Sequence, residues 1–254
     1  MLRDLCGKKM NLEVLPTRSA GAAENMATDF LLLQRYPQMQ EARFRHYGWH
    51  RPAFTFGYSQ QISFVREQLT SSAKASEGTP PDGPFDLCRR ATGGGVVDHR
   101  DDWTYALVIP RGHVLEEQSA THSYRVIHEA LAGALAAQGV PAVAKPAAVE
   151  TVTGPAGVCF QRAEMHDVIH ANSGEKIAGA AQKRNKHGLL FQGSVWRPAA
   201  GAAVDWEKFY GDFVAQLGAA LDVGTQPAPW PEFNEDELSG LVEKYTSPEW
   251  MEFR

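Results

Sequence analysis

The stretch HDVIHANSGEKIAGAAQKRNKHGLLFQGSV, residues 166–195, holds three strand patterns separated by turn residues. We expect strands at 166–170 and 175–182, joined by a turn at 171–174, and a third strand at 188–195. Consecutive strands with such short connections pair antiparallel, because a parallel pair needs a long crossover. The stretch therefore predicts a sheet built largely from hairpins rather than a doubly wound parallel sheet.

The rest of the chain alternates strand patterns with helix patterns. Apolar residues at helical spacing predict helices at 22–36, 118–138 and 205–217, and a last helix beginning at an Asn234 cap. Apolar alternation or continuous apolar runs predict a hairpin over 44–58, with its turn at 48–52, and strands at 85–90 and 103–110. Composition predicts loops at 71–84 and 141–157 and a linker at 224–233. We expect an α+β fold of mixed, largely antiparallel sheets flanked by helices, in one domain over 1–254 with 224–254 as a C-terminal linker and helix packed on it.

The composition has no strong charge bias. The chain has 254 residues, 25 Lys plus Arg and 30 Asp plus Glu, which gives a net charge of −5 and argues against nucleic-acid binding. Its three cysteines show no paired spacing, so we expect no disulfide framework, and neither a CxxC nor an HExxH pattern predicts a metal site. No apolar run matches a signal peptide or a membrane span, so we expect a cytoplasmic protein, and we expect a monomer.

A run of three glycines at 93–95 follows the predicted strand at 85–90. Glycine has no Cβ, so a ligand can approach such a backbone closely and its amide groups can point at an oxyanion or phosphate. The run matches neither a Walker A loop nor GxGxxG, and a plain turn at a strand end is the alternative. Its neighbours Arg89, Arg90 and His99 favour a binding loop.

Cys159 and Lys176 are the candidate reactive pair. Only a few per cent of a free thiol with a pKa of about 8.5 is thiolate at neutral pH, so a catalytic cysteine needs a cation nearby. Lys176 is the best candidate for that cation, and the small residues at 178–181 after it suit a groove. The alternatives are a buried, inert cysteine and an edge-strand lysine that discourages aggregation.

Several motifs occur in an order that identifies a known family. The two most specific are Arg-Arg-x-Thr-Gly-Gly at 89–94 and Lys-Ile-x-Gly-x-Ala-Gln at 176–182. Shorter matches lie at 25–29, 45–49, 56–60, 158–160, 192–194 and 244–250. Together they resemble the biotin/lipoate protein ligase catalytic family over nearly the whole chain, and most closely its cysteine-dependent octanoyltransferase branch.

The resemblance implies a mixed-sheet fold with an acyl-binding tunnel, and an enzyme that transfers an octanoyl or lipoyl group to a lysine of a lipoyl domain. It implies that Cys159 carries the acyl group as a thioester and that Lys176 is its partner lysine. The residues expected to bind substrate are Arg45, Arg89, Arg90, Thr92, Gly93, Gly94, Gly95, His99, Gly179, Ala180 and Ala181.

The partners implied are acyl carrier protein and lipoyl-domain proteins, namely glycine cleavage H protein or a 2-oxoacid dehydrogenase E2. Carrier proteins are acidic and so is this chain, so docking requires a local basic face. We expect that face at Lys183, Arg184 and Lys186, with Arg89 and Arg90; a solvated hairpin turn is the alternative for the first three.

The implied reaction needs no cofactor. Thioester exchange changes the free energy little and the formation of the amide is downhill, so no cofactor is expected.

Two other functions stay open. An ATP-dependent lipoate–protein ligase would form a lipoyl-adenylate with ATP and Mg; such ligases have Gly-Asn shortly after the His99 position, where this chain has Asp101-Asp102-Trp103. An inactive relative would only bind acyl groups or carrier proteins. In the cysteine-dependent transferase the acceptor lysine must lose a proton, which costs about 4 to 5 kcal/mol at neutral pH, and His99 is the candidate base.

Overall fold

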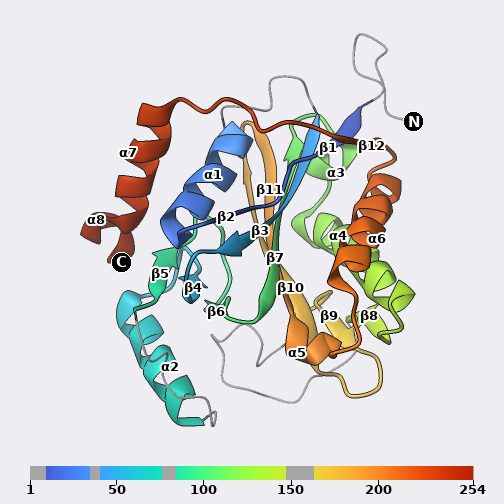
Figure 1. Cartoon of the computed structure of the whole chain (residues 1–254), viewed down its shortest axis with the longest axis horizontal. Helices are drawn as coiled ribbons and strands as arrows, with labels where there is room; N and C mark the ends of the chain where they lie inside the picture. Colours follow the sequence, from blue (N-terminus) through green and yellow to red (C-terminus); the bar gives the residue numbers. More distant parts are fainter. Residues whose placement is uncertain (1–9, 35–40, 76–83, 147–162, 254) are drawn as a thin grey trace.

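The computed structural model describes residues 10–34, 41–75, 84–146 and 163–253 (Figure 1). Nine strands of these residues form one mixed sheet in the order β12-β1-β3-β7-β11-β10-β9-β8, with β2 also paired to β3. The strands are β1 Asn11–Val14, β2 Arg18–Ala20, β3 Ala42–Trp49, β7 Asp102–Pro110, β8 Ala142–Ala144, β9 Val168–His170, β10 Lys176–Asn185, β11 Gly188–Trp196 and β12 Gly224–Pro227. From β3 to β8 every neighbouring pair is antiparallel, as the sequence predicts, and only β12, β1 and β2 add parallel pairs.

The strand β7 lies at the centre of this sheet and is buried along its whole length. Its side chains alternate between two apolar clusters: Trp103, Tyr105 and Leu107 face one, and Ala106 and Val108 face the other. Figure 1 shows α4 and α6 against the first face of the sheet and α1 with α7 on the opposite face. A continuous apolar run is what a strand covered on both faces requires.

The helices with described residues are α1 Ala22–Gln34, α2 Ile62–Ala75, α3 Val114–Glu117, α4 Ala120–Ala137, α5 Arg197–Ala200, α6 Trp206–Ala220, α7 Glu235–Thr246 and α8 Pro248–Met251. The predicted helices at 22–36, 118–138 and 205–217 are confirmed as α1, α4 and α6. The α7 cap is also confirmed, because Asn234 Oδ1 accepts hydrogen bonds from the backbone N–H of Asp236 and Glu237 at 2.9 and 3.1 Å. None of the described helices has the length and apolar character needed to cross a membrane.

The predicted hairpin over 44–58 is wrong. Its first strand, β3, belongs to the large sheet, whereas its second strand, β4 (Ala53–Phe56), is the centre of a separate three-stranded sheet. There β4 pairs with β5 (Asp86–Arg89) on one side and with β6 (Val97–Asp98) on the other. All four residues of β4 are buried, so the strand needs cover on both faces and cannot sit at a solvated hairpin edge.

Three irregular segments expected from composition contain regular structure. The loop expected at 71–84 overlaps α2, which continues to Ala75 and had no predicted counterpart. The loop expected at 141–157 contains the short strand β8, and the linker expected at 224–233 contains β12. Strands of three or four residues leave too little periodicity to read, and β12 forms only because β1 offers it a parallel partner.

Candidate active site

A pocket lies where the small sheet meets β10 and β11, and the space in it and in its open mouth together is about 450 Å³. Small residues of the two strands, Gly179, Ala180, Ala181 and Gly193, form one part of its lining. The other lining residues are Met26, Tyr47, Thr55, Arg90, Gly94, Val97, His99, Thr104, Gln192 and Ser194. The pocket thus combines a lining without bulk, suited to an unbranched chain, with a set of buried polar groups.

The glycine run is held by Arg90. The Arg90 guanidinium donates to the carbonyl oxygens of Gly93 and Gly95 at 2.8 and 3.0 Å, and it also donates to the Thr55 hydroxyl at 2.7 Å. Gly94 has φ +90°, a conformation that favours glycine. A Cβ on Gly57 would lie 2.0 Å from the Gly94 carbonyl oxygen, so the loop also packs directly on the backbone after β4.

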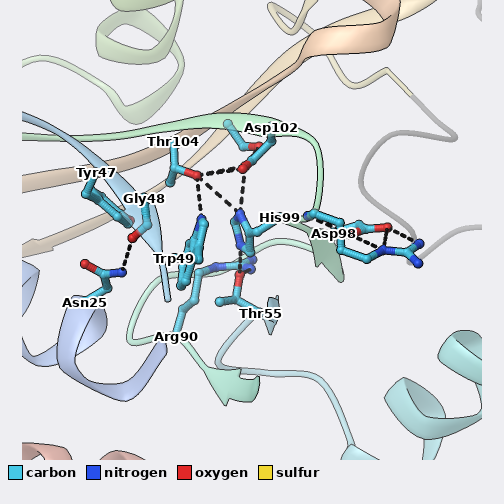
Figure 2. A network of polar contacts seen from close by, with 12 residues as sticks. Asn25, Tyr47, Gly48, Trp49, Thr55, Arg90, Asp98, His99, Asp102 and Thr104 are labelled. Carbon is cyan, nitrogen blue, oxygen red and sulfur yellow. Dashed lines mark hydrogen bonds and ion pairs between the residues drawn. The ribbon is translucent and has the colours of Figure 1, made fainter. Parts of the chain in front are cut away.

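His99 is the centre of a buried polar network (Figure 2). Its Nδ1 lies 2.7 Å from Asp102 Oδ2, and its Nε2 lies 2.7 Å from the Thr55 hydroxyl. Thr104 and Ser194 also donate to the Asp102 carboxylate, and Trp49 packs on His99 with ring centroids 4.2 Å apart and the rings tilted by 30°. The carboxylate favours a proton on Nδ1, so Nε2 accepts from Thr55. Both ring nitrogens are therefore engaged, and His99 positions Thr55 and, through it, Arg90.

A second network joins the pocket to α1. Asp29 is fully buried, and Arg45 Nε donates to one of its oxygens at 2.6 Å while Gln192 donates to the other at 2.7 Å. Thr92 in turn donates to the Gln192 side chain at 2.7 Å. Burial raises the pKa of Asp29, an effect that the Arg45 charge and these hydrogen bonds oppose. The network fixes Gln192 in the pocket wall.

Six of the predicted substrate-binding residues line the pocket: Arg90, Gly94, His99, Gly179, Ala180 and Ala181. Thr92, Gly93 and Gly95 lie in the same loop without lining it. Arg45 and Arg89 have structural partners instead. Arg45 forms a buried ion pair with Asp29. Arg89 donates to the carbonyl oxygens of Tyr58, Gln60 and Met251, and so connects the chain after β4 to α8.

Lys176 begins β10 and is 6% exposed. Its Nζ lies 2.7 Å from Asp167 Oδ2, just before β9. A Cβ on Gly179 would come within 2.8 Å of Nζ, so the lysine side chain lies directly against a residue of the pocket wall. Since β10 is flanked by β9 and β11, the alternative of an edge-strand lysine is wrong.

Cys159, the predicted nucleophile, lies outside the described residues. Cys88 is described; it belongs to β5, is 1% exposed, and packs in an apolar cluster with residues of α1 and α7. Burial raises the pKa of its thiol to about 12, so it stays protonated at neutral pH. Cys88 is therefore an inert core residue and not a rival to Cys159.

The predicted docking residues differ in exposure: Lys183 is half-buried and Arg184 and Lys186 are exposed, whereas Arg89 and Arg90 are buried. Arg184 donates to the carbonyl oxygens of Glu116 and Gln118, and Lys183 Nζ lies 3.4 Å from the Ala91 carbonyl oxygen; Lys186 is exposed. Arg89 and Arg90 are 0% and 4% exposed, so their inclusion in a docking face is wrong. Their guanidinium groups donate hydrogen bonds to carbonyl oxygens inside the protein.

Sequence analysis missed the acidic partners of the site. Asp102 orients His99, and Asp167 pairs with Lys176. Two uncharged polar residues, Gln192 and Ser194, also line the pocket and were not predicted to bind substrate. A signal existed for two of them: Asp102 follows His99 by three residues at the start of the buried strand, and Asp167 opens the hairpin that contains Lys176. Neither spacing is distinctive enough to separate these carboxylates from surface ones.

Gly193 lines the pocket and packs closely against the ring of Tyr105. A Cβ at this position would lie 2.2 Å from two ring atoms of Tyr105, which is fully buried and cannot move aside. We expect Gly193→Ala to destabilise the protein by about 1–3 kcal/mol, the usual cost of overpacking. Gly211→Ala in α6 is the matched control, because a Cβ there meets nothing within 4 Å, and it should gain up to about 1 kcal/mol. Equal effects in urea unfolding would contradict this packing.

His128 of α4 lies beside the Lys176–Asp167 pair as a buried neutral base. Its Nδ1 lies 2.7 Å from the His166 carbonyl oxygen, and burial lowers its pKa to about 4. The unfolded chain binds this proton near pH 6.5, so the histidine contributes full stability above that pH and loses it as the pH falls toward 4.

The expected loss of unfolding free energy from His128 is about 2–3 kcal/mol between pH 7 and pH 4.5. Urea unfolding at both pH values measures it, with His128→Gln as the reference that cannot titrate. The wild type should lose about that much more than the variant. Identical losses would mean that His128 does not titrate as its burial requires.

The fold is that of the lipoate–protein ligases. A solved bipartite lipoate protein ligase from Thermoplasma acidophilum superposes with a TM-score of 0.70 at 18% identity, covering 96% of this chain and 98% of that one. Residues 21–199 match the family described as lipoyl protein ligase A/B catalytic domain.

The chain belongs to that family. Among its relatives are two proteins named octanoyltransferase LipM. The one from Macrococcus caseolyticus is 27% identical over 91% of this chain and 94% of its own length, and the one from Kyrpidia tusciae is 29% identical over 93% and 97%.

Proposed function

We propose that this protein is an acyltransferase of protein lipoylation, which moves an octanoyl group onto a lysine of a lipoyl domain. The observation that carries the proposal is the alignment with the octanoyltransferases of two bacteria along more than nine tenths of both chains. The pocket supports it, because an acyl chain packed on Gly179, Ala180 and Ala181 gains about 0.8 kcal/mol for each buried methylene.

In the proposed reaction, the Cys159 thiolate attacks the thioester of octanoyl-acyl carrier protein; its bond to the octanoyl carbonyl carbon forms, the bond to the carrier-protein sulfur breaks, and the carrier protein leaves as thiolate. Cys159 then carries the octanoyl group as an enzyme thioester. The lysine of the lipoyl domain then attacks this thioester, and the Cys159 thiolate leaves. The Lys176 ammonium lies against the pocket wall, where it favours the thiolate and stabilises the oxyanion that develops on the carbonyl. No ATP or metal is required, since the thioester already carries the energy.

The proposed partners are acyl carrier protein as donor and a lipoyl-domain protein, glycine cleavage H protein or a 2-oxoacid dehydrogenase E2, as acceptor. The basic residues that we propose to contact an acidic donor are Lys186, Lys183 and Arg184. Lys186 is exposed on the turn between β10 and β11, whereas Lys183 and Arg184 also hydrogen-bond to backbone carbonyl groups of the protein. We place the protein in the cytoplasm, where a free thiol stays reduced, and propose that it acts as a monomer.

The test uses purified protein with a lipoyl domain and two separate donors. Octanoyl-acyl carrier protein without ATP should octanoylate the domain, and free octanoate or lipoate with ATP and Mg²⁺ should not. Modification only in the second reaction would replace the transferase by a ligase. No modification in either reaction would favour a relative that binds acyl groups or carrier proteins without catalysis.

A further inference from the structure

Lys176 does not stand alone in the site, because a chain of hydrogen bonds holds its partner. Asp167 Oδ2 accepts from Lys176 Nζ and from the Glu164 backbone N–H, both at 2.7 Å. The other carboxylate oxygen, Oδ1, accepts from the Tyr124 hydroxyl at 2.6 Å. Asp167 is 1% exposed, so this carboxylate is fixed and screened from water.

Tyr124 connects this carboxylate to the wall of the pocket. Its hydroxyl oxygen accepts from the Ala180 backbone N–H at 3.0 Å. Beyond Ala178, β10 has no registered partner in β9, so the tyrosine takes the place of a neighbouring strand at Ala180. A single hydroxyl thereby sets Asp167 and, through it, Lys176 relative to the residues that line the pocket.

The proposed pairing of Lys176 with the Cys159 thioester creates a chemical hazard. A neutral amine next to an acyl thioester attacks its carbonyl carbon and forms an amide, which is the reaction proposed for the lysine of the lipoyl domain. The same attack by Lys176 would leave the enzyme acylated on its own lysine, in a bond that does not turn over. Only the neutral amine can attack, because the ammonium has no free electron pair.

We propose that Asp167, positioned by Tyr124, keeps Lys176 protonated and so protects the enzyme from acylating itself. This inference rests on the thioester proposed for Cys159. A buried carboxylate 2.7 Å from Nζ favours the charged form of the lysine over the neutral one. Lys176 then acts as a cation that stabilises anions and cannot act as a nucleophile, while the incoming lysine loses its proton and is acylated.

The acylation of Lys176 by the Cys159 thioester needs no further reagent. The Lys176 amine adds to the octanoyl carbonyl, the C–N bond forms, the C–S bond breaks, and Cys159 leaves as thiolate. The amine gives its proton to that thiolate or to solvent. Nothing is oxidised or reduced, so only the protonation state of Lys176 separates a working enzyme from an inactivated one.

The experiment incubates each protein with octanoyl-acyl carrier protein, treats it with hydroxylamine, and maps the remaining octanoyl group by peptide mass spectrometry. Asp167→Asn keeps the shape and removes the charge, and it should accumulate a hydroxylamine-stable octanoyl group on Lys176. Wild type and Glu175→Gln should not; Glu175 is an exposed carboxylate next to Lys176 in sequence, so its variant is the matched control. The double variant Asp167→Asn/Lys176→Arg should lose the stable group.

The outcomes distinguish the protective role of Asp167 from the thioester mechanism proposed for Cys159. A folded Asp167→Asn protein that carries only a hydroxylamine-labile group, or no group at all, overturns the protective role. A wild type that never forms the labile group overturns the proposed thioester instead. Tyr124→Phe supplies a milder case if Asp167→Asn fails to fold: it keeps the ion pair, loses one donor to Asp167, and should form the stable group more slowly.

Discussion

Replacing Cys159 with serine is expected to lower the rate of octanoyl transfer to a lipoyl domain by more than about 1,000-fold. A serine hydroxyl is hardly ionised at neutral pH and is a poor nucleophile toward a thioester unless a base activates it. Loss of a catalytic nucleophile is among the largest effects that one substitution produces. The measurement is the transfer rate with saturating octanoyl-acyl carrier protein.

Cys88→Ala is the matched control for this prediction. Cys88 is buried and its pKa is about 12, so its removal should cost stability in the core and leave the transfer rate within a few-fold. A Cys159→Ser protein that retains most of its activity would remove the Cys159 thiolate from the mechanism, whatever Cys88→Ala does.

Replacing Lys176 with methionine is expected to slow enzyme acylation about 100-fold or more, the scale observed when an oxyanion donor is removed. The variant loses the cation that favours the Cys159 thiolate and stabilises the oxyanion. It also leaves the Asp167 carboxylate buried without its partner, which costs about 3–5 kcal/mol of stability. Single-turnover acylation and urea unfolding must therefore be measured together.

A double variant separates the two effects of Lys176. Lys176→Met with Asp167→Asn removes both charges, and replacing a whole buried ion pair is often neutral for stability. We expect the double variant to regain much of the lost stability and to stay slow in acylation. Recovery of the rate along with the stability would show that Lys176 serves only the fold.

Much of the large sheet could be predicted from residues 166–195 and 103–110, because long strands with clear turns carry strong patterns. The separation of β3 from β4 could not, since Phe54 and Phe56 alternate as in a hairpin strand although the whole of β4 is buried. Which sheet a strand joins depends on partners distant in sequence, here β5 and β6.

The glycines and small residues of the candidate site could be predicted from the sequence better than the roles of its charged side chains. The glycine run and the small residues of β10 stand out in the sequence, and they line or adjoin the pocket. The arginines were less certain, because Arg90 and Arg89 read alike in sequence but contact the glycine loop and the C-terminal helix respectively. Carboxylates such as Asp167 were missed because burial, which makes them informative, is invisible in sequence.

The intact mass of the wild-type protein after incubation with octanoyl-acyl carrier protein, without ATP or an acceptor, tests the mechanism most directly. We expect one octanoyl group per chain, located on Cys159 and released by hydroxylamine. A protein that never carries an octanoyl group of its own in this incubation, yet octanoylates a lipoyl domain at full rate once the domain is added, would contradict the covalent mechanism.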